Sequence, residues 1–456
     1  MPAEFQINDA DIAFAESMLL PEEKYFDNER RRFIRNLEMV DLQAVPGSGK
    51  TTALLAKLLV LDRHLPHSDN QGVLVISHTN AAVNEISDRI GSVCPKLFTY
   101  PNFVGTIQRF VDTFLAIPMF VSLFKKRPDR IDNDSYNLKT NQFQKAYLKG
   151  YSKDEQNRAK YFLNNNQYCS TYRLSLENNQ LVPIKSISEG RLNIKKPRPY
   201  SKGYKGWDEH ETKRVSSWLV DYKINILRDG ILCYDDAYLL AELALASFPL
   251  LFKLIPRRFR YVFVDEMQDM APHQYGLLER MFGDEAETDT IFQRIGDSDQ
   301  AIFGGKNFID TEGWQPRAKT LTLSNSLRLP PRIANILPPF AYERDTNFEI
   351  IGLQDAVIPP HLLIYDDNSI GFVIERYAQL IKKFQQDGSI PSASDSRYMA
   401  IAWNSAWDEA PDPQEQKYRL IDFCPSFRRS KLRKQEEFET LADYISSEAS
   451  PHTDET

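Results

Sequence analysis

The segment AVPGSGKTT, residues 44–52, constrains the fold of this chain more than any other feature of its sequence. An apolar run, MVDLQAV, leads into it and is typical of a buried strand, and TTALLAKLLVLDRH continues as an amphipathic helical pattern. A glycine-rich loop between a strand and a helix is the context that a phosphate-binding loop requires. We therefore expect a parallel sheet with helical crossovers and a site for phosphate groups at the edge of that sheet.

The residue types in this loop suit phosphate chemistry. Gly47 and Gly49 allow backbone N–H groups to turn inward, and the helix that follows adds the positive end of its dipole. Lys50 would reach the β- and γ-phosphates of a nucleotide, and the Thr51 hydroxyl would be a ligand for Mg²⁺. We predict that nine consecutive residues bind the nucleotide: Ala44, Val45, Pro46, Gly47, Ser48, Gly49, Lys50, Thr51 and Thr52.

Two adjacent carboxylates follow another predicted strand. The run RYVFVDEMQD places Asp265 and Glu266 directly after buried β-type residues, at the carboxyl edge of a sheet where ligands bind. Asp265 would hold Mg²⁺, directly or through water, and Glu266 would orient and deprotonate the attacking water. Two acids after a strand can instead cap a helix, but the phosphate loop upstream favours the catalytic interpretation.

Apolar periodicity divides the chain into segments. Strand and helix patterns alternate from GVLVIS through AAVNEISDRI to NFVGTIQRFVDTFL, and they weaken where Asn, Tyr, Lys and Ser dominate. They resume at AYLLAELALASFPLLFKLI, for which we expect one long helix, and TIFQRIGD and KTLTLS are further predicted strands. HLLIYDD and RYMAIAW, with the helical pattern FVIERYAQLIKKFQQ between them, indicate the beginning of a second α/β unit.

These segments predict an α/β fold with three parts. A first parallel-sheet core is formed by residues 1–117 and 224–320, an inserted subdomain by residues 118–223, and a partial second core domain by residues 321–456. The net charge of −7, from 56 basic and 63 acidic residues, excludes a globally basic nucleic-acid binder but not a local basic groove.

The location of the protein is predicted from its cysteines and its apolar segments. The N-terminus carries acids where a signal peptide has basic residues, and Glu242 and Pro249 interrupt the most apolar stretch. We expect a cytoplasmic protein that spans no membrane. Four cysteines lack metal-ligand spacing and are expected to be buried thiols in a reducing compartment: Cys94, Cys169, Cys233 and Cys424.

Five motifs and their order resemble the superfamily 1 DNA helicases of the UvrD/Rep type. They are AVPGSGKT, SHTNAAVNEI at 77–86, VGTIQ at 104–108, VDEMQD at 264–269 and IGDSDQAIFG at 295–304, and LSNSLRLPPRI at 323–333 resembles the next motif. The resemblance implies a RecA-like P-loop core with an inserted subdomain and the start of a second RecA-like domain. It also implies ATP and Mg²⁺ as cofactors and single-stranded or tailed DNA as a partner.

The resemblance assigns roles to individual residues. Gln300 would sense the γ-phosphate and couple it to the DNA site, and Arg328 would act as an arginine finger from the second core domain, with a surface salt bridge as the alternative. Gln268 and Asp269 would link the nucleotide state to the loop that carries Gln300. Contacts to DNA phosphates are expected from three further residues: Thr79, Asn80 and Thr106.

The chain departs from the family's pattern at several ligand positions. Arg30 stands where the adenine-reading glutamine belongs and is expected to help bind the nucleotide, and Leu327 stands where an aromatic ring stacks on adenine. A relaxed choice of nucleotide is therefore expected. His78 replaces a phenylalanine that stacks on DNA bases, and Phe303 replaces a tyrosine, so both are expected to contact DNA. Gly305 stands in the place of a tryptophan, and because stacking contributes ~1–3 kcal/mol per base, losing this platform should weaken the grip on the single strand or alter its stepping.

A basic segment lies in the predicted inserted subdomain. Residues 185–205 contain seven basic side chains against one acid, with tyrosines interleaved. Charge for phosphates and rings for bases suit DNA binding, and relatives of this family contact DNA through this subdomain. A solvated loop is the alternative interpretation. The residues expected to bind DNA are Lys195, Lys196 and Arg198.

The end of the sequence also departs from the family. A K-G-L-E segment and a T-R-A segment with a second arginine finger are absent before Thr456. We expect either a truncated chain or a partner that supplies these elements, and truncation is favoured because the second sheet would otherwise have too few strands.

These observations favour an ATP-dependent single-stranded DNA translocase or helicase. The alternative is an ATPase that senses DNA ends and signals to a partner without unwinding, and a dead scaffold conflicts with the intact Lys50, Asp265 and Glu266. AVPGSGKTT, FVGTIQRFVDTFLAIP and the arginines at 30–32 resemble the helicase-like subunit of Gabija-type antiphage systems. That resemblance implies an OLD-family nuclease as partner and a role in defence.

Overall fold

A computed structural model describes residues 6–66, 70–140, 143–166, 172–187, 190–194, 207–300, 314, 317–340, 349–355, 358–390, 398–400 and 418–425. The chain forms two compact units, Met1–Gln354 and Asp355–Thr456.

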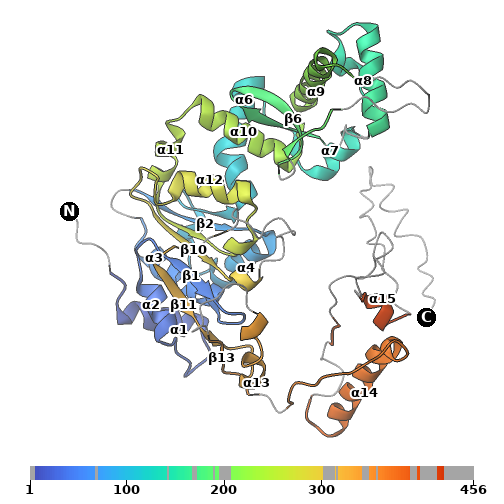
Figure 1. Ribbon diagram of the computed structural model, residues 1–456. Helices are drawn as coiled ribbons and strands as arrows, with labels where there is room; N and C mark the ends of the chain where they lie inside the picture. Colours follow the sequence, from blue (N-terminus) through green and yellow to red (C-terminus); the bar gives the residue numbers. More distant parts are fainter. Residues whose placement is uncertain are drawn as a thin grey trace, which may run out of the picture. The chain divides into compact units, whose positions relative to one another are not determined.

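The first unit is built on a parallel sheet of six strands in the order β11-β1-β10-β9-β2-β3 (Figure 1). The strands are β1 Asp41–Ala44, β2 Gly72–Ser77, β3 Phe103–Thr106, β9 Phe259–Val264, β10 Ile291–Gly296 and β11 Thr320–Leu323. The central strands β2 and β9 are almost wholly buried and nearly continuously apolar, as strands of parallel sheets are, whereas the edge strands β3 and β11 are partly exposed. The expected α/β fold with a P-loop type of sheet is confirmed.

Helices cover both faces of this sheet. Strand β2 shows the alternation: Val73 and Val75 pack into one layer, and Leu74 and Ile76 pack into the other. The first layer contains α2 Asn28–Arg35, α3 Lys50–Arg63 and α4 Asn80–Ile90, and α1 Asp9–Leu19 packs on the outside of α3. The second layer contains α5 Ile107–Val111, α6 Ile117–Phe124, α10 Tyr234–Ser247 and α12 Pro272–Phe282.

The continuous helical segment Ile107–Phe124 is long and apolar enough to cross a membrane. Its residues Phe110, Val111, Leu115 and Phe120 are fully buried against the sheet and α10. The burial of this face within the first unit accounts for the apolar composition of the helix. A π-helical turn at Asp112–Ala116 lies within this segment and joins α5 to α6.

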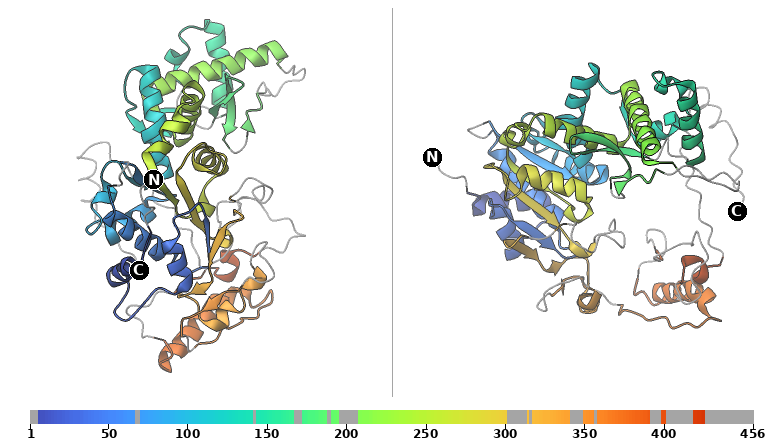
Figure 2. Two further views of the ribbon diagram at one scale, coloured as in Figure 1. Left: turned by 90° about the vertical axis from the view of Figure 1, so that its left-hand side faces the viewer. Right: turned by 45° about the horizontal axis from the view of Figure 1, so that its top comes forward.

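The inserted subdomain has a hydrophobic core of its own. Figure 2 shows this subdomain projecting from the sheet. It contains α7 Asn133–Thr140, α8 Lys153–Asn166, the antiparallel strands β5 Arg173–Glu177, β6 Gln180–Ser186 and β7 Gly190–Arg191, and α9 Glu209–Asp229. Strands β4 Arg130–Ile131 and β8 Ile231–Leu232 pair where the chain enters and leaves.

The structure differs from the expected boundaries of this subdomain. Position 118 lies inside α6, and position 223 lies inside α9, because both helices bury one face in a core and continue until that face ends. The paired strands β4 and β8 are the natural borders. A second expected element is also different: the apolar stretch after Tyr234 is bent by 101° between α10 and α11 Leu251–Leu254. Pro249 causes the break, since it lacks an N–H and disfavours helical backbone at Phe248.

The boundary expected after residue 320 is different as well. Strand β11 pairs in parallel with β1 and completes the first sheet, and the chain up to Gln354 stays in the same unit. Beyond β11, strand β12 Asn325–Ser326 pairs with β13 Ile351–Gly352, and α13 Pro331–Ala334 begins at the second of two consecutive prolines. The start of the segment after β11 therefore packs against the phosphate loop.

The second unit contains α14 Val373–Gln386 and α15 Leu420–Phe423. The helix α14 was expected, but HLLIYDD forms no strand: Leu362 is 85 % exposed and Ile364 is 89 % exposed. A strand needs a neighbour to pair its backbone groups, and the described part of this unit offers none. Of RYMAIAW, residues 398–400 are described and form no strand.

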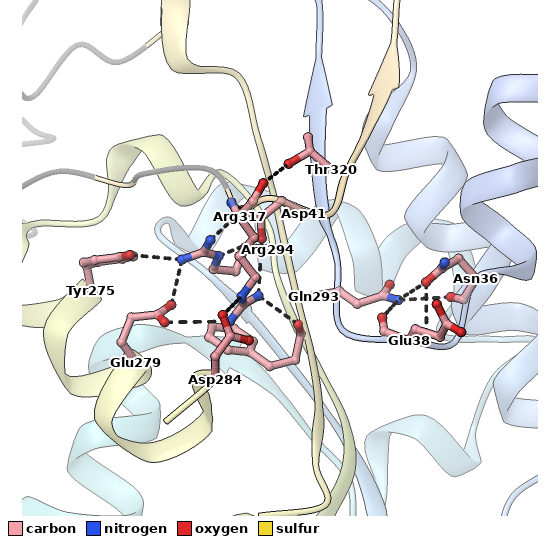
Figure 3. A network of polar contacts seen from close by, with 11 residues as sticks. Asn36, Glu38, Asp41, Tyr275, Glu279, Asp284, Gln293, Arg294, Arg317 and Thr320 are labelled. Atoms are coloured by element: carbon pink, nitrogen blue, oxygen red, sulfur yellow. Dashed lines mark hydrogen bonds and ion pairs between the residues drawn. The ribbon is translucent and has the colours of Figure 1, made fainter. Parts of the chain in front are cut away.

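A buried network of charges joins β1, β10 and α12 (Figure 3). Arg294 donates to both carboxylate oxygens of Asp41, at 2.7 and 2.5 Å, and it also pairs with Glu279 at 2.9 Å. The Arg317 backbone N–H donates to Asp41 at 2.7 Å and its side chain pairs with Asp284 at 3.1 Å. Asp41 and Arg294 are opposite each other in register, so this network fixes the alignment of two central strands.

Candidate nucleotide and DNA site

The phosphate loop connects β1 to α3 with two glycines in left-handed conformation. Gly47 has φ +73° and Gly49 has φ +74°, which L side chains rarely adopt. A Cβ at Gly47 would lie 2.4 Å from the Cβ of Arg328, so the segment after β11 approaches the loop too closely for any other residue. The pattern of glycines that the sequence showed is thus required by backbone conformation at both positions and by close packing at the first.

The carbonyl groups of the loop are held from outside. Ser326 Oγ donates to the Pro46 carbonyl at 2.7 Å, and the Leu327 N–H donates to the Gly47 carbonyl at 2.9 Å. Arg30 donates to the Ser48 carbonyl. With the carbonyls engaged there, the first N–H groups of α3, which have no intrahelical partner, are left for an anion.

Lys50 and Glu266 bring the two halves of the predicted site together. Lys50 opens α3, Glu266 follows β9, and their side chains form an ion pair. Glu266 has φ 55°, a left-handed conformation that is uncommon for a residue with a side chain and that directs its carboxylate toward the loop. The Glu266 N–H donates to Asp265 at 3.0 Å.

Asp265 has the electrostatics of a cation ligand. It is 2 % exposed, and burial together with the neighbouring Glu266 carboxylate raises its pKa to about 7. A carboxylate in such a negative environment gains from a nearby cation. Oxygen donors from Asp265 and from the Thr51 hydroxyl suit Mg²⁺, which uses one or two carboxylates and completes its shell with water and substrate phosphates. Among the described residues, no group of three or more His, Cys, Asp or Glu side chains could hold a metal by itself.

A chain of hydrogen bonds leads from Glu266 to Gln300. Gln268 Nε2 donates to Glu266 at 2.6 Å, and its carbonyl oxygen accepts the Asp297 N–H at 3.0 Å. Asp297 in turn accepts from Gln300 Nε2 at 2.8 Å. A Cβ at Gly296 would lie 2.5 Å from the Gln268 oxygen, so only glycine allows this approach. Asp297 is fully buried and was not singled out from the sequence, although it lies inside the IGDSDQ motif.

The remaining residues of the predicted nucleotide site lie around the loop. Thr52 Oγ1 accepts a bond from Arg89 on α4 at 3.2 Å. Arg328 and Leu327 are exposed on the segment that packs against the loop, and Arg328 has no ion pair with a carboxylate among the described residues. Arg30, in contrast, is buried, and protein atoms accept its hydrogen bonds.

The predicted DNA contacts in the first core lie side by side at the carboxyl edge of the sheet. Strands β2 and β3 pair from Leu74–Phe103 to Ser77–Thr106, so the helices that follow them begin next to each other. Thr79 caps α4 through a bond from Ala82 at 3.2 Å, and Thr106 caps α5 through a bond from Arg109 at 3.2 Å. Thr79 and Asn80 are exposed, and His78 is partly buried.

The other predicted DNA residues, Phe303, Lys195, Lys196 and Arg198, lie outside the described residues. Several basic side chains in the described part of the same subdomain pair with acids: Arg191 with Glu177, Lys213 with Glu209, and Arg214 with Glu155.

The comparisons with known proteins agree with this arrangement. Residues 28–307 match the UvrD/REP helicase N-terminal domain. The chain is 25 % identical over 303 residues to the ATP-dependent DNA helicase PcrA of Bacillus subtilis, which covers 64 % of this chain and 36 % of that helicase. It is 23 % identical over 324 residues to PcrA of Staphylococcus epidermidis, covering 68 % and 39 %, respectively. The match thus spans less than two fifths of the length of these helicases.

The family match includes the phosphate loop, the Asp265–Glu266 pair and the segment that ends at Gln300, and it accounts for more than half of the chain. The chain belongs to the UvrD/REP helicase family.

Proposed function

We propose that this chain hydrolyses ATP with Mg²⁺ and uses the energy to move along, or unwind, single-stranded or tailed DNA. The observation that carries the proposal is the continuous chain of polar contacts from Lys50 through Glu266, Gln268 and Asp297 to Gln300. It begins at the phosphate loop and ends at Gln300, which precedes the predicted DNA residue Phe303 by three positions in the sequence. A site that only bound a nucleotide would not need this second half.

Each residue near the loop has a step to perform in hydrolysis. The first N–H groups of α3 and the Lys50 ammonium would bind the phosphates, and Mg²⁺, held by Thr51 and Asp265, would neutralise charge on the phosphate oxygens. Glu266 would orient the attacking water and accept its proton. Lys50 must leave Glu266 to reach the phosphates, and this frees the carboxylate for the water. Arg328 and Gln300 would stabilise the γ-phosphate during transfer.

The edge formed by the starts of α4 and α5 supports the DNA part of the proposal. Two hydroxyl-capped helix N-termini lie next to each other there, and helix N-termini favour phosphate groups. The PcrA proteins to which the chain is similar are named ATP-dependent DNA helicases. We infer that Thr79, Asn80 and Thr106 contact the backbone of a single strand, with His78 beside them.

A second candidate is an ATPase that senses DNA ends and activates an OLD-family nuclease in antiphage defence, without processive unwinding. The observation in its favour is the replacement of DNA-stacking rings by His78 and Gly305, since a weaker grip on DNA suits sensing better than long translocation.

The test measures ATP hydrolysis by the purified chain with and without single-stranded DNA, beside strand separation on a tailed duplex. We expect DNA-stimulated hydrolysis that Glu266→Gln abolishes. Strand separation would favour the helicase, and stimulation by DNA ends without separation would favour the sensor. Hydrolysis by Glu266→Gln equal to that of the wild type would overturn the catalytic assignment.

A further inference from the structure

Arg30 occupies a buried position between three segments that are distant in sequence. Its side chain is 5 % exposed and lies between α2, the phosphate loop and strand β12. The guanidinium forms an ion pair with Asp27 and donates to the carbonyls of Ser48 and Asn325, the latter at 3.0 Å. Its Nε has no partner within hydrogen-bond range, and a Cβ at Gly49 would lie 3.7 Å from it, so Nε faces the loop.

Asp27 and Asn325 hold the guanidinium in place. One oxygen of Asp27 accepts the Arg30 N–H at 2.9 Å and so caps α2, and the other forms the ion pair. That second oxygen also accepts from Asn325 Nδ2 at 2.8 Å. A planar guanidinium with several donors can satisfy a carboxylate and two carbonyls at once, which a lysine ammonium of flexible reach would do less well. The cluster therefore requires arginine in particular.

We propose that Arg30 is a positioning residue that holds the phosphate loop in its nucleotide-binding conformation and does not itself read the base. The proposal rests on the proposed nucleotide site. The guanidinium fixes the Ser48 carbonyl on the outer side of the loop, next to Gly49 and Lys50, whose N–H groups must face the phosphates. Pre-organising the loop lowers the cost of binding any nucleoside triphosphate, because less ordering remains to occur when the phosphates arrive.

A residue that holds the loop should affect the affinity for nucleotides but not the choice between ATP and GTP, whereas a residue that reads the base would affect both. Holding the loop acts on the triphosphate, which ATP and GTP share, so losing Arg30 should weaken both nucleotides by the same factor. Contact with the base would instead change the ratio between them. Once a nucleotide is bound, the chemistry depends on Glu266 and Gln300, which Arg30 does not touch, so kcat should change little.

The variants are Arg30→Gln, Arg30→Lys and Asp27→Asn. Asparagine is as good a helix N-cap as aspartate, so Asp27→Asn keeps α2 capped while it replaces the oxygen that pairs with Arg30 and accepts from Asn325 by an amide NH2 group. Arg32→Gln is the matched control, because Arg32 is an exposed arginine on the same helix. Binding of non-hydrolysable ATP and GTP analogues, KM and kcat for both nucleotides, and the melting temperature are measured for each variant.

We expect Arg30→Gln to raise both dissociation constants and both KM values about 10- to 100-fold, the loss of a charge-assisted hydrogen bond, with kcat within about twofold. Asp27→Asn should act in the same direction but less, Arg30→Lys should rescue part of the loss, and Arg32→Gln should resemble the wild type. A changed ratio between ATP and GTP, or unchanged affinity for both, would overturn the proposal. The analogues report binding without turnover. A wild-type protein that binds them but hydrolyses neither ATP nor GTP would therefore contradict the proposed function and leave the proposal for Arg30 standing.

Discussion

Lys50 of the phosphate loop forms an ion pair with Glu266, the predicted catalytic carboxylate, across 216 positions of sequence. The pair is partly buried, with the Lys50 and Glu266 side chains 12 % and 30 % exposed. Water therefore solvates the two charges poorly, and each charge compensates the other. A triphosphate must compete with Glu266 for Lys50. Nucleotide binding and the release of the catalytic carboxylate are therefore one event in this site.

The first prediction follows from that competition. Glu266→Gln removes the charge that holds Lys50, so it should bind ATP several-fold more tightly while hydrolysis falls by at least about 100-fold. Lys50→Ala should weaken binding instead. Equilibrium titration with a fluorescent ATP analogue and a steady-state phosphate assay check the two effects. Weaker binding by Glu266→Gln would show that the ion pair does not oppose the nucleotide.

The second prediction concerns the link between the carboxylates and the Gln300 loop. Gln268→Ala removes the bonds to both Glu266 and Asp297 and should lower DNA-stimulated hydrolysis about tenfold, with a smaller effect on basal hydrolysis. Gln268→Glu keeps the size but places a second negative charge beside Glu266, and it should be worse. Stimulation by saturating DNA is the measurement. Equal loss of basal and stimulated rates would show that Gln268 serves catalysis alone.

The third prediction is a pH dependence of stability. Burial raises the pKa of Asp112 to about 6 from 3.8, although the bond from Gln108 at 2.8 Å opposes the rise. The folded chain then binds more protons than the unfolded chain between about pH 4 and pH 6, so the contribution of Asp112 to stability falls as the pH rises through this window. Asp112→Asn cannot ionise and still accepts the Gln108 bond.

Asp112→Asn should therefore stabilise the protein at pH 7 by up to about 3 kcal/mol and should have little effect at pH 4. Urea unfolding at both pH values measures the difference, with Asp112→Ala as the variant that also loses the Gln108 bond. An equal effect at both pH values would assign the change to packing rather than to ionisation.

The fourth prediction concerns the junction between the inserted subdomain and the core. Lys223 on α9 and Asp236 on α10 form an ion pair at 2.9 Å with both side chains at most 1 % exposed, and Asp236 also accepts the Cys233 N–H at the start of α10. Lys223→Met would leave a buried carboxylate without its cation, at a cost of about 3–5 kcal/mol.

The exposed pair of Lys213 and Glu209 supplies the control, since Lys213→Met should cost less than about 1 kcal/mol. Thermal and urea unfolding, followed by the fluorescence of the tryptophans, report both variants. A melting temperature for Lys223→Met equal to that of Lys213→Met would mean that the buried pair does not stabilise the junction.

The fifth prediction concerns the basic segment. Replacing Lys195, Lys196 and Arg198 by alanine should weaken DNA binding similarly for all sequences and reduce the slope of log K against log salt by about 2. Lys213→Ala with Arg214→Ala is the control, because acids already neutralise both side chains. Fluorescence anisotropy at several salt concentrations distinguishes the triple variant from the control. An unchanged slope for the triple variant would favour the alternative interpretation, that the segment is a solvated loop that does not bind DNA.

The sequence alone determined the elements whose signals are local. A strand, two glycines, a lysine and a helix are adjacent along the chain, so the loop at 44–52 could be predicted from its neighbours, as could the strand that ends in Asp265 and Glu266. The order of these motifs was also sufficient to indicate the family.

Tertiary structure decided what depends on contacts between distant segments. Whether residues 320–323 join the first sheet depends on pairing with β1, and the ends of α6 and α9 depend on which core buries each face, so the expected boundaries at 118, 223 and 320 could not be placed. Arg30 was expected at the nucleotide because of its position in the sequence. Its actual partners are Asp27, three residues away, Ser48, 18 residues away, and Asn325, 295 residues away. They come together only when α2, the phosphate loop and β12 pack, and hydrogen bonds between such separate segments leave no periodic signal in the sequence.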